Sequence, residues 1–188
     1  MNEPTNESMS ESMSESMREF NDAIDQLDEV VDQWWEQWRN QPLVDRVFYT
    51  ASEAADFSLL WHALGVAQAI IEDDPKIAIG LSAALGVESA LLNGPIKSIF
   101  GRGRPLQPSP RPLNLRQPIT SSFPSGHASA AMVAAAVLSR RTGGPLWYML
   151  GAVVAASRLH VRIHHASDVL GGLVVGAVFG KIARRLLP

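Results

Sequence analysis

Three short polar stretches, set in otherwise apolar sequence, carry the side chains needed to handle a phosphate group. They cover residues 97–105, 124–127 and 157–168, and together they supply fixed cations, two histidines and one carboxylate. Guanidinium and ammonium groups neutralise phosphate oxygens. One His can attack phosphorus while the other protonates the leaving oxygen, and the carboxylate can orient the attacking ring. The pattern predicts a phosphoryl-transfer site that needs no metal or other cofactor.

The second and third stretches indicate how such a site is built. Residues 124–127 read Pro-Ser-Gly-His, which is typical of a helix start whose free backbone N–H groups bind an anion. His164 and Asp168 are four residues apart, so they meet on one face of a helix or tight turn. A carboxylate that accepts one ring N–H fixes the tautomer and leaves the other nitrogen free to attack.

The order and spacing of these stretches resemble the three-part signature of the type 2 phosphatidic acid phosphatase superfamily. That superfamily also includes bacterial acid phosphatases and vanadium haloperoxidases. The motifs are Lys-x6-Arg-Pro at 97–105, Pro-Ser-Gly-His at 124–127 and Ser-Arg-x5-His-x3-Asp at 157–168, and the resemblance covers about residues 42–188. By this resemblance the phosphate is bound by Lys97, Arg104, Ser125, Gly126 and Arg158, while His127 is the general acid, His164 the nucleophile that forms a phosphohistidine, and Asp168 its orienting partner.

The resemblance implies a membrane phosphatase that hydrolyses a phosphomonoester or diphosphate of a lipid. Compact bacterial members resemble this chain in length, and some act on polyprenyl phosphates of envelope synthesis, so a polyprenyl phosphate or diphosphate is the favoured substrate. Phosphatidic acid or phosphatidylglycerophosphate is the next alternative. A vanadate-dependent haloperoxidase and a non-catalytic lipid-binding scaffold are the alternatives from other classes. The expected partners are the lipid substrate and the bilayer, with no nucleic acid, and the sequence leaves the oligomeric state open.

Composition divides the chain into two unlike parts. Residues 1–46 carry twelve acidic and three basic side chains, whereas residues 47–188 carry seven acidic and thirteen basic ones. The chain has no cysteine, which excludes disulfides and thiolate chemistry. Beyond Asp74 the acidic residues are Glu88 and Asp168, so neither is ordinary surface charge.

The N-terminal part is expected to contain a tail and one helix. Residues 1–17 repeat Ser-Glu-Ser-Met and predict a disordered tail, with the internal methionines as alternative starts and no cleaved signal peptide. Residues 18–41 have apolar side chains at steps of three and four, which predicts an acidic amphipathic helix. This helix either packs on its own domain or a partner, or places its Trp-rich end at the lipid headgroups.

Residues 42–188 are expected to form an all-α transmembrane bundle of about five helices. The apolar segments are about 57–71, 77–96, 128–138, 145–156 and 169–183. Glycine at every fourth position from Gly172 to Gly180 suits close helix packing in lipid. Alternation places all three motifs on one side, and Lys and Arg in the opposite loops predict that this opposite side is cytoplasmic. The protein is therefore expected in the cell membrane, multi-pass, with an extracytoplasmic site. Membrane members of the superfamily commonly have six spanning helices, and here the first is missing or replaced by the acidic helix.

Polar residues outside the signature are expected to have supporting roles. Glu88, within an apolar segment, is predicted to make structural hydrogen bonds, and His62 to be a packed helix residue. Zinc binding by the histidines around His164 is a weak alternative, because the surrounding Arg side chains would repel the metal. The remaining polar residues near the motifs are assigned to the surface or the substrate rim: Arg102, Arg111, Arg116, His160, Arg162 and His165.

Overall fold

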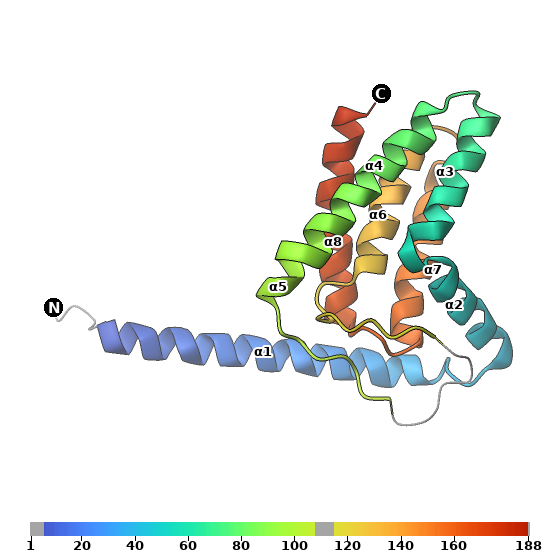
Figure 1. The fold of residues 1–188 in the computed structure, drawn as a ribbon. Coiled ribbons are helices and arrows are strands. Elements are labelled where there is room, and N and C mark those ends of the chain that lie inside the picture. Colours follow the sequence, from blue (N-terminus) through green and yellow to red (C-terminus); the bar gives the residue numbers. More distant parts are fainter. Residues whose placement is uncertain (1–5, 108–114, 188) are drawn as a thin grey trace.

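The computed structural model describes residues 6–107 and 115–187, and in these residues all regular structure is helical. Five helices run side by side as a bundle, and another crosses one end of it (Figure 1). Each of the five predicted apolar segments forms one helix of the bundle, which confirms the predicted all-α class. The helices are α1 (Asn6–Glu36), α2 (Pro42–Ala54), α3 (Leu59–Ile71), α4 (Lys76–Leu91), α5 (Lys97–Ile99), α6 (Gly126–Leu138), α7 (Pro145–His160) and α8 (Ala166–Leu186).

Helix α6 lies at the centre of the bundle, and most of its side chains are buried. The glycines of α8 face it at every fourth position. A Cβ atom at Gly176 would lie 2.3 Å from the carbonyl oxygen of Ser129, and one at Gly172 would lie 2.3 Å from that of Ser125. The two backbones can approach this closely only because α8 has no side chains there, as the glycine spacing predicted.

The chain stays helical beyond the last regular turn of α4. It continues through a π-helical turn, Leu92–Ile96, into the short helix α5. Pro95 lies in this turn and has no N–H to donate, so the regular ladder cannot pass through it. The change of path brings Lys97 inward, where its side chain is buried.

The N-terminal helix is longer than the sequence pattern predicted. Because α1 begins at Asn6, the prediction of a disordered tail over residues 1–17 is wrong for residues 6–17, and residues 1–5 lie outside the described part. Glu and Met are good helix formers, and extending an existing helix costs far less than nucleating one. The predicted amphipathic segment, residues 18–41, therefore forms only the C-terminal part of α1 and the turn that follows it.

Helix α1 lies across the motif end of the bundle, and its N-terminal part extends beyond the bundle (Figure 1). Trp35 Nε1 donates to His160 Nδ1 at 3.1 Å, and His160 Nε2 lies 2.8 Å from Asp45 Oδ1 on α2. Arg162 donates to Asp32 at 3.1 Å. His160 and Arg162 were predicted at the surface or the substrate rim, and they instead anchor the N-terminal helices to the bundle.

Two continuous helical stretches, Lys76–Ile99 and Ala166–Leu186, are long and apolar enough to cross a membrane. A third crossing results if α2 and α3, which bend by 64° at their junction, count as one span. Helix α6 is shorter than a full span, and its apolar side chains serve the core instead.

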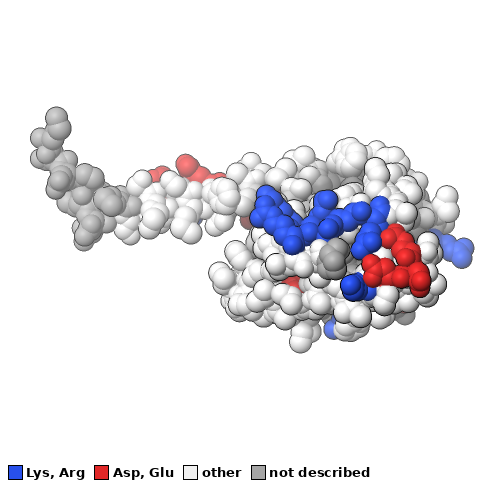
Figure 2. Space-filling model, turned by 90° about the horizontal axis from the view of Figure 1, so that it is seen from above, with Lys and Arg blue, Asp and Glu red and all other residues white. Residues whose placement is uncertain are grey.

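The end of the bundle opposite α1 carries a cluster of charged residues. Figure 2 shows Lys and Arg side chains gathered there beside a smaller acidic patch. Lys76, Arg140, Arg141 and Arg184 line one small depression on this end. Arg141 also pairs with Asp74 at 3.1 Å. The three motifs and this basic cluster therefore lie at opposite ends of the bundle.

Candidate active site

The three motifs converge on one cavity of about 510 Å³ at the α1 end of the bundle. Lys97 reaches it from α5, Gly126 and His127 from the start of α6, and His164 from the turn between α7 and α8. Thr120 lines the same cavity and its Oγ1 lies 3.4 Å from Lys97 Nζ. The wall thus combines a cation, two imidazole rings and the N-terminus of a helix.

His164 is buried between two cationic groups and one carboxylate. Its Nε2 lies 3.4 Å from a guanidinium nitrogen of Arg104, and its Nδ1 lies 3.6 Å from Asp168 Oδ2. The predicted His164–Asp168 pair therefore forms as a close contact that is longer than a hydrogen bond. Burial lowers the pKa of His164 to about 3, with help from the charges of Arg158 and Arg104 and against the opposing effect of Asp168. The ring is neutral at physiological pH, as a nucleophile must be.

Asp168 is fully buried at the start of α8, and both of its carboxylate oxygens accept hydrogen bonds. Oδ2 accepts the backbone N–H of His165 at 2.8 Å and lies 3.2 Å from His165 Nδ1, which closes a capping box at the start of α8. Oδ1 accepts from Arg102 at 3.0 Å. His165 and Arg102 were predicted at the surface or the rim, but both hold Asp168 in place.

Arg102 connects this carboxylate to α1. It donates to Asp28 at 2.6 Å and to Asp25 at 3.1 Å, and it also contacts Ser167 Oγ at 2.5 Å. Asp28 is 6% exposed and additionally accepts from the backbone N–H and the hydroxyl of Ser167, both at 2.7 Å. Asp28 therefore caps α8 from a neighbouring helix. Sequence reasoning missed this contact because it joins residues more than one hundred positions apart.

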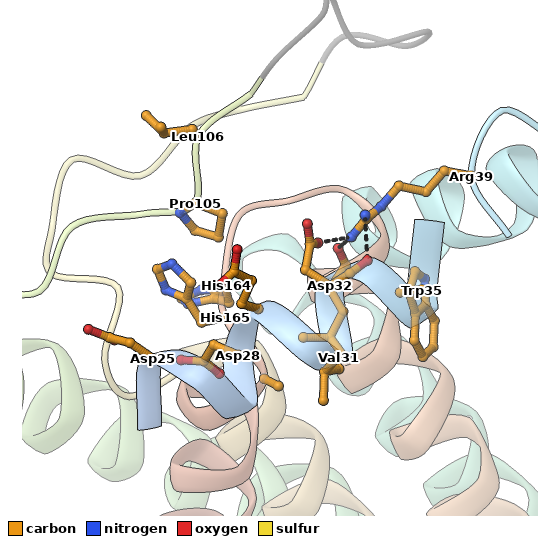
Figure 3. Close-up of a pocket in the computed structure, with 13 residues that line it drawn as sticks. Asp25, Asp28, Val31, Asp32, Trp35, Arg39, Pro105, Leu106, His164 and His165 are labelled. Atoms are coloured by element: carbon orange, nitrogen blue, oxygen red, sulfur yellow. Dashed lines mark hydrogen bonds and ion pairs between the residues drawn. The ribbon is translucent and has the colours of Figure 1, made fainter. Parts of the chain in front are cut away.

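A second cavity of about 340 Å³ lies between α1 and the motif loops. Figure 3 shows Asp28 and Asp32 of α1 facing His164 and His165, with Pro105 and Leu106 on the other side. His164 borders both cavities, so its ring forms part of the wall between them. Helix α1 thus covers the outer side of the site.

The predicted phosphate-binding arginines hold the loops as well as the site. Arg104 donates to the carbonyl oxygens of Ile163 at 2.9 Å and Thr120 at 3.0 Å. Arg158 is 2% exposed, and its guanidinium contacts Ser52 Oγ. The backbone oxygen of Arg158 accepts the N–H of His164 at 3.3 Å. Both charges sit behind the cavity wall, next to His164, and stabilise negative charge in the cavity from there.

Helix α6 begins at Gly126 with Ser125 as its N-cap, as predicted, but the side chain of Ser125 makes no capping bond. The backbone N–H of Ser125 donates to the carbonyl oxygen of Asp168 at 2.9 Å. The N–H of Ser125 is therefore not one of the free donors predicted at this helix start, which leaves those of Gly126 and His127, the first in the helix, to face an anion. His127 Nε2 lies 3.0 Å from Asp56 Oδ1, in the link between α2 and α3. Asp56 was not identified from the sequence.

Arg116 and His62, which lie outside the three motifs, also line the cavity. Arg116 stacks over Phe57 at 4.5 Å and borders the cavity, in agreement with its predicted place at the rim. His62 was predicted to be packed, and it lines the cavity instead. Arg111 lies outside the described residues. In the described parts of the chain, no group of three His, Cys, Asp or Glu side chains has an arrangement that could hold a metal ion.

The fold is a helical bundle with apolar spanning helices, and its cavity is bordered by cations and two imidazoles. These features are typical of a membrane protein that binds phosphate. The sequence model of the PAP2 superfamily matches residues 76–188. The chain therefore belongs to the PAP2 superfamily, which confirms the resemblance identified from the three motifs.

Comparisons with individual proteins agree with this assignment. The chain is 39% identical over 87 residues to a decaprenylphosphoryl-5-phosphoribose phosphatase of Mycobacterium tuberculosis (strain CDC 1551 / Oshkosh), which covers 46% of this chain and 49% of that one. It is 35% identical over 124 residues to the protein of the same name from Mycolicibacterium smegmatis, covering 64% of this chain and 67% of that one. The matched region thus spans about half of the Mycobacterium tuberculosis relative.

Among solved structures, the chain resembles a transmembrane PAP2-type phosphatidylglycerolphosphate phosphatase from Bacillus subtilis. The TM-score is 0.67 at 22% identity, and the match covers 87% of this chain and 86% of that one. This similarity shows a shared fold.

Proposed function

We propose that this protein removes the terminal phosphate from a membrane lipid phosphate through a phosphohistidine intermediate. The observation that carries the proposal is the convergence of His164, His127 and Lys97 on one cavity, with Arg104 and Arg158 next to His164. We assign the catalytic roles to His164, His127 and Asp168. The phosphate contacts assigned to this chain are Lys97, the backbone N–H of Gly126 and the hydroxyl of Ser125, while Arg104 and Arg158 act through their charge from behind the cavity wall.

Each step uses a group in a suitable position. His164 Nε2, next to Arg104, attacks phosphorus while Nδ1 faces Asp168, which stabilises the cation that forms. The P–O bond to the leaving group breaks, and His127 gives that oxygen a proton. A water molecule then attacks the phosphohistidine, the P–N bond breaks and inorganic phosphate leaves. The fixed cations offset the charge of the transferring group throughout.

We assign the substrate to polyprenyl-type lipid phosphates. The two mycobacterial relatives carry names that specify a decaprenyl lipid with a phosphoribose headgroup, and both match this chain at 35% identity or more. In such a lipid the bond to be cleaved is a phosphomonoester on a sugar. Phosphatidic acid and phosphatidylglycerophosphate are the comparison substrates.

We further propose that the site faces the extracytoplasmic side of the cell membrane. The basic cluster with Arg140, Arg141 and Arg184 lies at the opposite end of the bundle, and an excess of Lys and Arg in short loops is typical of the cytoplasmic side. At the site end, Trp34 of α1 and Trp38 in the turn that follows α1 are 58% and 42% exposed, as expected for rings near the headgroups.

Phosphate release from the purified protein tests the proposal. We expect release from a synthetic polyprenyl-phosphoryl-pentose 5-phosphate in detergent with EDTA present, and phosphorylation of His164 that is stable to base and labile to acid. The variant His164→Ala should lose both signals while remaining folded. Full turnover by this variant would overturn the mechanism, and the absence of release from every lipid phosphate tested would overturn the function.

A further inference from the structure

The cavity extends well beyond the part that holds the phosphate. Its far part runs between α3 and α4, where it is lined by His62 on α3 and by Ser82, Gly86 and Ser89 on α4. Spacings of four and three residues place these α4 positions on one helix face. The same face continues to Asn93, whose side-chain amide donates to Ser89 at 3.1 Å. A polar groove therefore runs along a helix that is otherwise apolar enough to span a membrane.

Glu88 differs from the other polar residues of this groove because its carboxylate is buried. It is 2% exposed and lines the cavity, yet its Oε1 has no hydrogen-bond partner among the described residues. Ser129 is close enough to influence the carboxylate but lies outside hydrogen-bonding geometry. The structural hydrogen bonds predicted for Glu88 are thus incomplete. A buried acceptor without a partner is costly, and an ionisable residue inside a spanning helix is by default functional.

The end of the groove farthest from the phosphate site carries an exposed polar contact between two helices. His62 Nδ1 lies 2.9 Å from Ser82 Oγ and joins α3 to α4. The groove thus offers a carboxylate, hydroxyls, an amide and an imidazole along one side of the cavity. Such groups can hydrogen-bond to hydroxyls, whereas an acyl or prenyl chain in the same place would leave Glu88 Oε1 without a partner.

We propose that this groove is a hydroxyl-binding subsite, with Glu88 Oε1 accepting a hydrogen bond from a sugar-like headgroup that links the terminal phosphate to the lipid. This inference rests on the phosphatase function proposed above and narrows its substrate class. Glu88 precedes Lys97 by nine residues, and both line the cavity. An ionised carboxylate only accepts hydrogen bonds, so Glu88 has nothing to donate to the phosphate itself, whereas it can accept from a hydroxyl of the group attached to it.

The test compares two synthetic substrates that differ only in hydroxyl groups. One is farnesyl-phosphoryl-pentose 5-phosphate, and the other is its dideoxy analogue without ring hydroxyls. We expect the full-length enzyme to favour the hydroxylated substrate about tenfold or more in kcat/KM, because a site built for a hydroxyl rejects analogues that lack it. In Glu88→Ala this preference should disappear, mainly through KM, while turnover of the dideoxy analogue stays within about twofold. Glu88→Gln, which keeps an acceptor oxygen, should recover part of the preference.

Controls separate this role from a purely structural one. Val87→Ala changes an exposed neighbour on α4 that does not line the cavity, and it should leave both substrates unaffected. If Glu88→Ala does not fold, Ser89→Ala tests the same groove and should reduce the preference in the same direction. An equal loss on both substrates, or no loss on either, would overturn the subsite. Absence of preference in the unmodified enzyme would also overturn it while leaving the phosphatase function intact, whereas no phosphate release from either substrate would contradict that function itself.

Discussion

One buried carboxylate makes several of the contacts between α1 and the motif end of the bundle. Asp28 accepts the backbone N–H and the hydroxyl of Ser167 and a hydrogen bond from Arg102, all within 2.7 Å. The substitution Asp28→Ala removes the acceptor of all three hydrogen bonds at once and leaves the charge of Arg102 with less compensation. Because breaking a buried ion pair typically costs about 3–5 kcal/mol, we expect the free energy of unfolding to fall by that amount. The cost should not reach the sum of three separate bonds, since contributions in one network are not additive.

A matched control is available one turn earlier on the same helix. Asp25 also pairs with Arg102, at 3.1 Å, but its side chain is 75% exposed. An exposed pair contributes about 0–1 kcal/mol, so Asp25→Ala should change stability little. Equilibrium unfolding in detergent, together with limited proteolysis of α1, measures the difference between the two variants. Equal effects of the two substitutions would refute the argument from burial.

The Asp28→Ala variant also tests whether α1 affects catalysis. Arg102 holds Asp168 Oδ1 at 3.0 Å, and Asp168 faces His164. Loosening Arg102 displaces the orienting carboxylate, and a displacement of about 1 Å can cost about 100-fold in rate. We therefore expect kcat of Asp28→Ala to fall by about 10- to 100-fold on a short-chain lipid phosphate. An unchanged kcat in a variant whose α1 has become sensitive to protease would show that α1 does not position the catalytic carboxylate.

Three further predictions follow from the packing and chemistry of the site. His127→Ala should lose most activity on substrates with poor leaving groups and least on a nitrophenyl phosphate, because only a poor leaving group needs the proton. A uniform loss of activity across a series of leaving groups would contradict the general-acid role. Gly176→Leu should destabilise the bundle by several kcal/mol in a thermal unfolding assay, because even a Cβ would lie 2.3 Å from Ser129 O; a wild-type melting temperature would show that α6 and α8 can separate freely. Burial holds the pKa of His164 at about 3 in the folded protein against about 6.5 in the unfolded chain, so its contribution to stability is complete above pH 6.5 and is lost as pH falls toward 3. Nitrogen-labelled histidine NMR should accordingly show a neutral His164 ring at pH 5, and a protonated ring at that pH would contradict the expected direction of the shift.

Local sequence was sufficient to predict the five apolar helices of the bundle and to identify candidate residues for the site. The five apolar segments each form one helix of the bundle, because hydrophobic length and small-residue spacing are properties of the segment itself. The glycine spacing from Gly172 to Gly180 likewise predicted the close packing that α6 and α8 show. The three motifs identified the superfamily, because the chemistry of binding phosphate requires particular side chains at fixed spacing.

Partners that come from distant segments could not be predicted in this way. His127 faces Asp56, Arg102 joins Asp28 to Asp168, and Trp35 bonds to His160. Asp28, Asp56 and Arg102, considered only with their sequence neighbours, resemble ordinary solvent-exposed residues.

The sequence by itself therefore predicted the side chains that we propose for phosphate chemistry and the apolar segments that form the bundle, but not α2 or the N-terminal part of α1. Only the tertiary structure decided that α1 covers the site, that Asp28 and Arg102 support Asp168, and that Glu88 opens into a groove beyond the phosphate. The physical reason is that helix formation and motif chemistry depend on neighbours a few residues apart. Burial, and the hydrogen bonds that compensate it, depend instead on which helices pack together, and that is fixed only when the whole chain folds.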